Sequence, residues 1–162
     1  MVSSFSVDEV FEMAEMMERN GADFYRKTAE KTDDPKLKNF LVSLSNMEIK
    51  HEAMFRKWRK ELAESDPINM LDPDNEGAMY LQTIVDGRVS FEHEEHGNES
   101  MQEILHGAIA SEKDTVIFYL GIQEAMGEHL DRDKIGRIIS EELGHIRQLT
   151  QLMHRQSFEK AQ

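Results

Sequence analysis

The sequence predicts an all-α protein, a four-helix bundle built from two similar helical hairpins with a long crossover connection. Apolar residues recur at alternating steps of three and four over four long stretches, which is the spacing of one face of an amphipathic helix. Turn-forming residues separate these stretches. In addition, a shift of 94 residues aligns the two halves of the chain without a gap, so that Ser6 and Glu9 fall on Ser100 and Glu103.

The first hairpin is expected to consist of helices over residues 7–31 and 35–64. Ser6 and Glu9 form a capping box before the first helix. Pro35 occupies the first position of the second helix, where its missing N–H is not needed. The residues that recur at steps of three and four lie on one face of each helix. On the first helix they are Val7, Phe11, Ala14, Glu18, Gly21, Tyr25 and Thr28, and on the second they are Leu37, Leu41, Leu44, Glu48, His51, Phe55, Trp58 and Leu62.

The second hairpin is expected to repeat this arrangement with helices over residues 100–126 and 131–158. Ser100 and Glu103 form its capping box, and Gly127 is a natural stop for the first of these two helices. The residues on one face are Met101, Leu105, Ala108, Glu112, Thr115, Tyr119, Ile122 and Met126 for the first of these helices, and Ile135, Ile138, Glu142, His145, Leu149 and Leu152 for the second.

Residues 65–99 are expected to form the crossover between the hairpins. The stretch ESDPINMLDPDNEG contains two of the three prolines, together with Asp and Asn residues that favour turns. A short helix over residues 78–91 fits the part that follows. The length of 162 residues suits one domain, residues 1–162, with a sizeable core.

Polar residues occupy the middle of each apolar face and repeat together with the apolar ones. Each hairpin contributes one glutamate from its first helix and a Glu-x-x-His pair from its second, and residues three apart lie on the same side of a helix. Packing of the hairpins about a pseudo-twofold axis would bring these side chains together in the middle of the bundle. The six residues are Glu18, Glu48, His51, Glu112, Glu142 and His145.

These residues predict a dinuclear metal site. Four buried carboxylates repel one another or hold protons unless cations neutralise them, and two divalent ions carry the matching charge. A single Glu-x-x-His is common, and one buried histidine is more often a core residue than a ligand. Two copies with partner glutamates at one offset are much harder to obtain by chance, which favours the metal site.

The composition argues against several other classes of protein. A formal net charge of −13 disfavours sequence-independent binding of nucleic acid, which depends on Lys and Arg. The sequence contains no cysteine and therefore no disulfide or thiolate-ligated metal centre. It shows neither a signal-peptide pattern nor an apolar run of about 18 residues. We therefore expect a soluble, cytoplasmic protein that does not bind membranes.

Four stretches around the polar positions resemble a known family: MMERNGADFY, NMEIKHEAMF, IASEKDTVIFY and ISEELGHIRQL. Over residues 6–158 the chain is similar to the ferritin-like di-iron carboxylate proteins, and most similar to their rubrerythrin-like branch. The resemblance implies a ferritin-like fold that binds two iron ions, with manganese or zinc as alternatives. It also implies terminal ligands Glu18 and Glu112, bridging ligands Glu48 and Glu142, and one metal for each of His51 and His145.

The same resemblance gives two tyrosines a role. Tyr25 and Tyr119 would donate hydrogen bonds to ligand carboxylates across the bundle. Ordinary aromatic packing explains them almost as well. Bundles of this family commonly pair, so the resemblance further implies a homodimer.

Two departures from the rubrerythrin pattern bear on activity. Rubrerythrins proper carry a further glutamate three residues after the ligand of the third long helix, where this chain has Thr115. They usually also carry a four-cysteine rubredoxin domain, whereas this sequence contains no cysteine. Efficient peroxide turnover is therefore in doubt, and electrons are expected from a separate donor such as a rubredoxin-type protein.

Three functions remain open from the sequence. The favoured one is a non-haem di-iron oxidoreductase that reduces hydrogen peroxide or dioxygen in defence against oxidative stress. The second is a ferroxidase or iron-handling protein. The third is a structural or interaction bundle whose redox-inert metal only holds the helices together.

A second histidine-containing stretch, FEHEEHG, precedes the third long helix. His93 and His96, with the neighbouring glutamates, are candidates for an accessory metal or entry site. A solvated acidic loop is the more ordinary explanation of such a charge run.

Overall fold

The computed structural model describes residues 6–65, 76–86, 99–126 and 132–159, and every secondary-structure element in them is a helix. In chain order these elements are α1 (Val7–Glu30), α2 (Pro35–Ser65), α3 (Glu76–Asp86), α4 (Met101–Ala125) and α5 (Arg132–Glu159). The predicted all-α bundle is confirmed. Within the described residues, no helix has both the length and the apolar character of a membrane-spanning segment.

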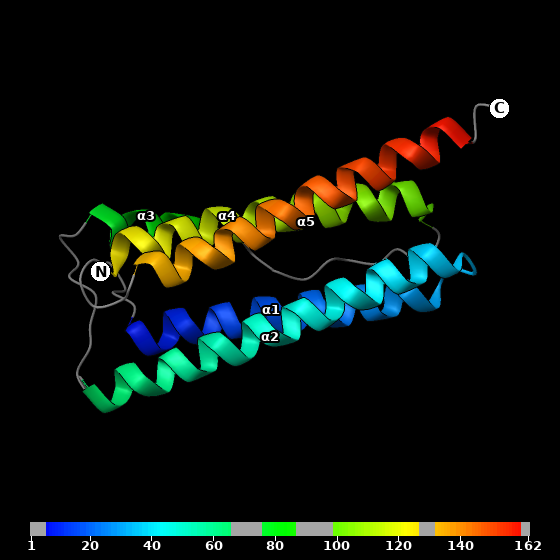
Figure 1. Cartoon of the computed structure of the whole chain (residues 1–162). Coiled ribbons are helices and arrows are strands. Elements are labelled where there is room, and N and C mark those ends of the chain that lie inside the picture. Colours follow the sequence, from blue (N-terminus) through cyan, green and yellow to red (C-terminus); the bar gives the residue numbers. More distant parts are fainter. Residues whose placement is uncertain (1–5, 66–75, 87–98, 127–131, 160–162) are drawn as a thin grey trace.

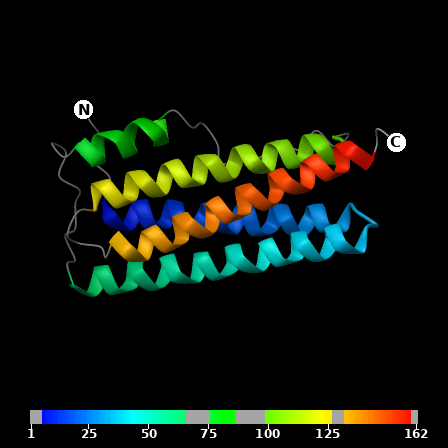
Figure 2. The same ribbon diagram turned by 45° about the horizontal axis from the view of Figure 1, so that its top comes forward.

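The four long helices form two antiparallel pairs (Figure 1). Helix α1 packs closely on α2, and α4 packs closely on α5. The two pairs face each other as two layers of one bundle, and α3 lies along the outside of α4 (Figure 2). The bundle therefore has the architecture of two joined helical hairpins.

Matching capping boxes start the first helix of each hairpin. The backbone N–H of Glu9 donates to Ser6 Oγ at 3.2 Å, while Ser6 N–H donates to the Glu9 carboxylate at 2.8 Å. In the second hairpin, the backbone N–H of Glu103 donates to Ser100 Oγ at 3.3 Å, and Ser100 N–H donates to the Glu103 carboxylate at 2.8 Å. Because the two helices start at equivalent points of the repeat, residues at equal distances from the caps have equivalent places in the two hairpins.

Two apolar clusters fill the bundle on either side of its middle. One cluster is formed by buried side chains from the first half of α1 and the second half of α2, such as Phe11, Phe55 and Trp58. Ile122 of α4 and Ile135 of α5 also belong to it. The other cluster draws on the opposite halves of the same helices. Its members include Tyr25, Leu37, Leu41, Leu44, Leu105, Ala108 and Leu149. The polar residues of the predicted site lie between the two clusters along each helix.

The crossover contains one helix that differs from its predicted range. Helix α3 begins at Glu76, two residues before the expected start at residue 78, and residues 87–91 lie outside the described part of the chain. Gly77 explains how this helix docks. A Cβ atom at Gly77 would lie 2.5 Å from the backbone nitrogen of Ala125, so only glycine allows this approach to the end of α4.

We expect Gly77→Ala to destabilise the protein by about 1–3 kcal/mol, because the added methyl group would push α3 away from backbone atoms of α4 that cannot rotate aside. Gly144→Ala on α5 is the matched control. No atom lies within 4 Å of its added Cβ, so it should stabilise the helix by roughly 0.5–1 kcal/mol. Urea denaturation of both variants measures the difference, and equal midpoints would contradict the close docking of α3.

Candidate metal centre

Six side chains from the four long helices meet in the middle of the bundle. Glu18 comes from α1, Glu112 from α4, and the two Glu-x-x-His pairs from α2 and α5. Each of the six residues is at most 5% exposed. They are the residues expected from the sequence: Glu18, Glu48, His51, Glu112, Glu142 and His145.

The six residues form two overlapping groups of potential metal ligands. In each group the ligand atoms lie within 4.8 Å of one another. We name the groups after their histidines, and Glu48 and Glu142 belong to both. The His51 position consists of Glu18, Glu48, His51 and Glu142, and the His145 position consists of Glu48, Glu112, Glu142 and His145.

Glu142 and Glu48 lie between the two histidines. His51 Nδ1 is 2.8 Å from Glu142 Oε1 and 3.5 Å from Glu48 Oε2. His145 Nδ1 is 2.8 Å from Glu142 Oε2 and 3.3 Å from Glu48 Oε1. Each of these two carboxylates thus directs one oxygen toward each histidine, which is the arrangement of a carboxylate shared by two metal ions. Glu18 and Glu112 each approach one histidine only, at 3.7 Å.

The polar atoms at this centre fit a cation. Glu48 Oε1, both oxygens of Glu142, His51 Nδ1 and His145 Nδ1 are fully buried and have no hydrogen-bond partner, although they lie close together. Buried polar atoms without partners are rare because each costs free energy. Carboxylate oxygens and imidazole nitrogens that converge in this way are suitable ligands for iron, manganese or zinc.

Without metal, protons neutralise the cluster. Burial, together with the charges of nearby carboxylates, raises the pKa of Glu18 and of Glu112 well above the usual range. Burial also disfavours ionisation of Glu48, but the two neighbouring imidazoles outweigh this effect and lower the pKa of Glu48 to about 2. Burial opposes the charged form of His145, yet Glu142 and Glu48 raise its pKa to about 10. The pKa of His51 is raised for the same reason.

The two tyrosines connect the hairpins through the terminal glutamates. Tyr25 on α1 donates its hydroxyl proton to Glu112 Oε1, and Tyr119 on α4 donates to Glu18 Oε1. Both tyrosines are buried, and burial followed by the nearby carboxylate charges raises their pKa well above the usual value. The hydroxyls therefore stay protonated and remain donors. They also pack in the apolar clusters, so the polar and the packing explanations both apply.

One neighbour of the centre was not expected. Glu141 Oε2 lies 2.8 Å from His51 Nε2, the ring nitrogen on the far side from the other glutamates. Glu141 carries little signal in the sequence, because its side chain is 49% exposed and it stands off the apolar face of its helix. The one signal for Glu141 in the sequence is a difference between the repeats, because a glutamate precedes the ligand Glu142 on α5 whereas Met47 precedes the ligand Glu48 on α2.

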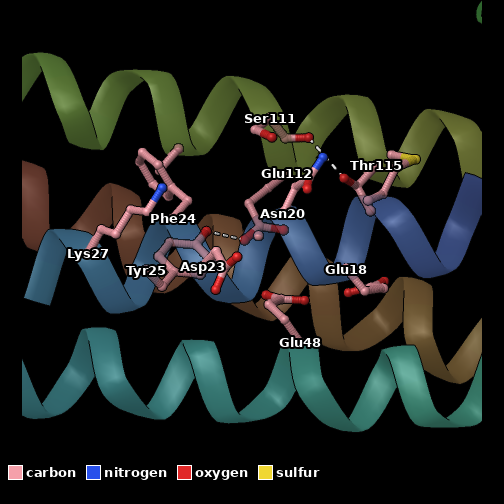
Figure 3. Close-up of a pocket in the computed structure, with 13 residues that line it drawn as sticks. Glu18, Asn20, Asp23, Phe24, Tyr25, Lys27, Glu48, Ser111, Glu112 and Thr115 are labelled. Atoms are coloured by element: carbon pink, nitrogen blue, oxygen red, sulfur yellow. Dashed lines mark hydrogen bonds between the residues drawn. The ribbon is translucent and has the colours of Figure 1, made fainter. Parts of the chain in front are cut away.

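A cavity of about 330 Å³ lies between α1 and α4 and reaches the centre. Figure 3 shows Glu18, Glu48 and Glu112 together with Tyr25 along it. Exposed residues, including Lys27, also line the cavity, which therefore connects the glutamates with the surface.

Thr115, at the position of the additional rubrerythrin glutamate, also lines the cavity. Its hydroxyl donates to the carbonyl of Ser111 at 3.1 Å, which satisfies it within its own helix (Figure 3). Gly21 is its counterpart in the repeat, and a Cβ there would lie 3.4 Å from Glu48 Cγ. The candidate accessory histidines, His93 and His96, lie outside the described residues.

We expect metal affinity to rise with pH because metal ions must displace the protons held by the free cluster. His145, with its pKa near 10, and His51 each hold a proton at neutral pH, and Glu18 and Glu112 add to the release. Loading of two divalent ions should therefore release at least two protons per chain near neutral pH. Calorimetry in buffers of different ionisation enthalpy counts these protons. Equal affinities at about pH 6 and pH 8 would contradict this account.

Two comparisons with known proteins found similarity: one in the sequence of the first hairpin, and one in the fold of the whole chain. Residues 3–59, which contain Glu18, Glu48, His51 and Tyr25, match the family model of rubrerythrin. A search of the curated proteins gave no match. Among solved structures, the chain is similar to a Thermotoga maritima protein described as a ferritin-like diiron-carboxylate protein, with a TM-score of 0.69 at 21% identity. The similarity covers 93% of this chain and 96% of that one. The chain therefore has the ferritin-like fold, and its first hairpin supports a rubrerythrin-like assignment.

Proposed function

We propose that the protein is a non-haem di-iron oxidoreductase that reduces hydrogen peroxide or dioxygen in defence against oxidative stress. The observation that carries the proposal is the convergence of unpartnered carboxylate and imidazole atoms between the two hairpins. The rubrerythrin match of the first hairpin supports it. Iron is the metal we propose, although the same ligand atoms also suit manganese or zinc.

The six residues would provide ligands for two metal ions. Glu18 and His51 would hold one ion, Glu112 and His145 the other, and Glu48 and Glu142 would be shared. When bound, a ferrous pair supplies the two electrons that cleave the O–O bond of hydrogen peroxide, which with two protons becomes two molecules of water.

The surrounding residues admit the oxidant and keep the ligands in place. The cavity between α1 and α4 is large enough for a molecule such as hydrogen peroxide, and Glu18, Glu48 and Glu112 line it. The tyrosine hydroxyls hold Glu18 and Glu112 from across the bundle. Because hydrogen bonds to a ligand carboxylate fix its orientation and charge, Tyr25 and Tyr119 would set the geometry of the two terminal ligands.

Electron supply and assembly belong to the same proposal. No cysteine occurs in these 162 residues, so they can hold no thiolate-ligated iron centre. We propose a separate rubredoxin-type donor, a cytoplasmic location and a homodimer.

The first experiment is anaerobic loading with Fe(II), followed by elemental analysis and by mixing with peroxide or oxygen. We expect about two irons per chain and rapid oxidation of both. Glu48→Ala and Glu142→Ala should lose most of the iron. Glu15→Gln is the control. Glu15, on α1, is buried like Glu48 and Glu142, but its carboxylate lies 3.5 Å from Arg56 and Arg59 and is not one of the six residues of the centre.

The outcomes separate the three functions. Catalytic consumption of peroxide with an added reductant supports the oxidoreductase. Oxidation of Fe(II) followed by release of Fe(III), without peroxide turnover, would indicate an iron-handling protein. Tightly bound zinc whose removal unfolds the chain, with no oxidation of bound Fe(II), would refute the proposal and indicate a structural metal.

Tyr25→Phe and Tyr119→Phe should each keep about two irons per chain but slow the reaction with peroxide by about tenfold or more, because one terminal carboxylate loses its donor. Tyr80→Phe on α3 is the control, since its side chain is exposed and far along the chain from any ligand. Stopped-flow absorbance measures the rates. Rates equal to that of Tyr80→Phe would assign the buried tyrosines to packing alone.

A further inference from the structure

The two histidines of the centre differ on the side that faces away from it. His51 Nε2 lies 2.8 Å from the carboxylate of Glu141. His145 Nε2 is buried and has no hydrogen-bond partner. On the inner side the two rings are alike, because each Nδ1 lies 2.8 Å from one oxygen of Glu142.

The sequence repeat explains the difference. Glu141 directly precedes the ligand Glu142 on α5, and the equivalent position on α2, directly before Glu48, holds Met47. A thioether is a weak acceptor at best and carries no charge. The ligand residues have thus been kept in both hairpins, while the outer carboxylate is present in only one.

This difference matters once a metal ion occupies Nδ1, because the ring proton must then reside on Nε2. At His51 the Nε2–H group has a carboxylate acceptor, which fixes the tautomer, orients the ring and makes Nδ1 more basic. At His145 the same N–H group would remain buried without an acceptor, which weakens any binding that requires it.

We infer that the two metal positions are unequal: the His51 position binds a divalent ion at least about tenfold more tightly and fills first, with Glu141 as its positioning residue. This inference rests on the proposed dinuclear site, but not on the redox reaction. The protein at limiting metal therefore holds one ion, in the His51 position, and the second ion enters only at higher concentration.

The test is an anaerobic titration of the metal-free protein with Co(II), in which calorimetry and visible absorption measure the binding. The wild-type protein should show two steps, each of one ion per chain, with affinities at least about tenfold apart. Glu141→Ala should weaken the tighter step by about 10–100-fold and leave the weaker one unchanged. Glu141→Gln keeps an acceptor oxygen and should restore part of the loss.

The reciprocal change is Met47→Glu, which should strengthen the weaker step and bring the two affinities together. His145→Ala should retain the tight step, whereas His51→Ala should lose it, and these variants assign the steps to positions. Glu30→Gln is the control for charge, because Glu30 is exposed at the end of α1, twelve residues or about 18 Å from Glu18.

Equal affinities in the wild-type protein, or a Glu141→Ala variant that weakens both steps or neither, would overturn the inference while leaving the dinuclear site intact. Absence of Co(II) binding would refute the site itself and with it the proposed function. Because Co(II) is titrated without oxidant, a protein that fails to reduce peroxide but binds in two unequal steps would still support the inference.

Discussion

Burial of four carboxylates in the middle of the bundle is the constraint on which the rest of the structure depends. Such groups are tolerated only where each finds a partner or a cation. Many of the partners come from the opposite hairpin: Tyr119 for Glu18, Tyr25 for Glu112, and His51 for Glu142. Separation of the hairpins would break these contacts, so the polar centre joins the two layers together with the apolar packing.

The apolar clusters hold the side chains of this centre in place. One cluster closes each end of the polar layer, with Phe55 and Tyr119 on one side and Leu41 and Leu44 on the other. Rigid packing of this kind positions ligand side chains more precisely than loops do. The described structure leaves an approach along the cavity between α1 and α4, where Gly21, which has no side chain, lies beside Glu48.

Much of this arrangement could be predicted from the sequence, because its signals are local or repeated. Capping boxes and apolar periodicity placed the ends of the four long helices within one residue of their observed bounds. The repeat indicated which polar residues would meet. Contacts between helices were harder to predict: Glu141 pairs with a ring on another helix, and its exposed side chain resembles any surface glutamate.

The early start of α3 is difficult to predict from the sequence for a related reason. Gly77 is a poor helix former, and its benefit appears only in the close approach to Ala125, a residue far along the chain. The cavity likewise depends on the distance between α1 and α4, which no pattern within either helix encodes.

The differences between the hairpins have a consequence for how such a centre can evolve. Each hairpin carries half of the ligand set, so two identical copies could assemble the same six residues as a symmetric pair. In that pair every change would appear twice, and both metal positions would remain the same. Joining the halves in one chain removes this restriction. Glu141 can then stand opposite one histidine while Met47 occupies its counterpart, and Gly21 can diverge from Thr115. A single chain thereby allows one half-site to specialise without changing the other.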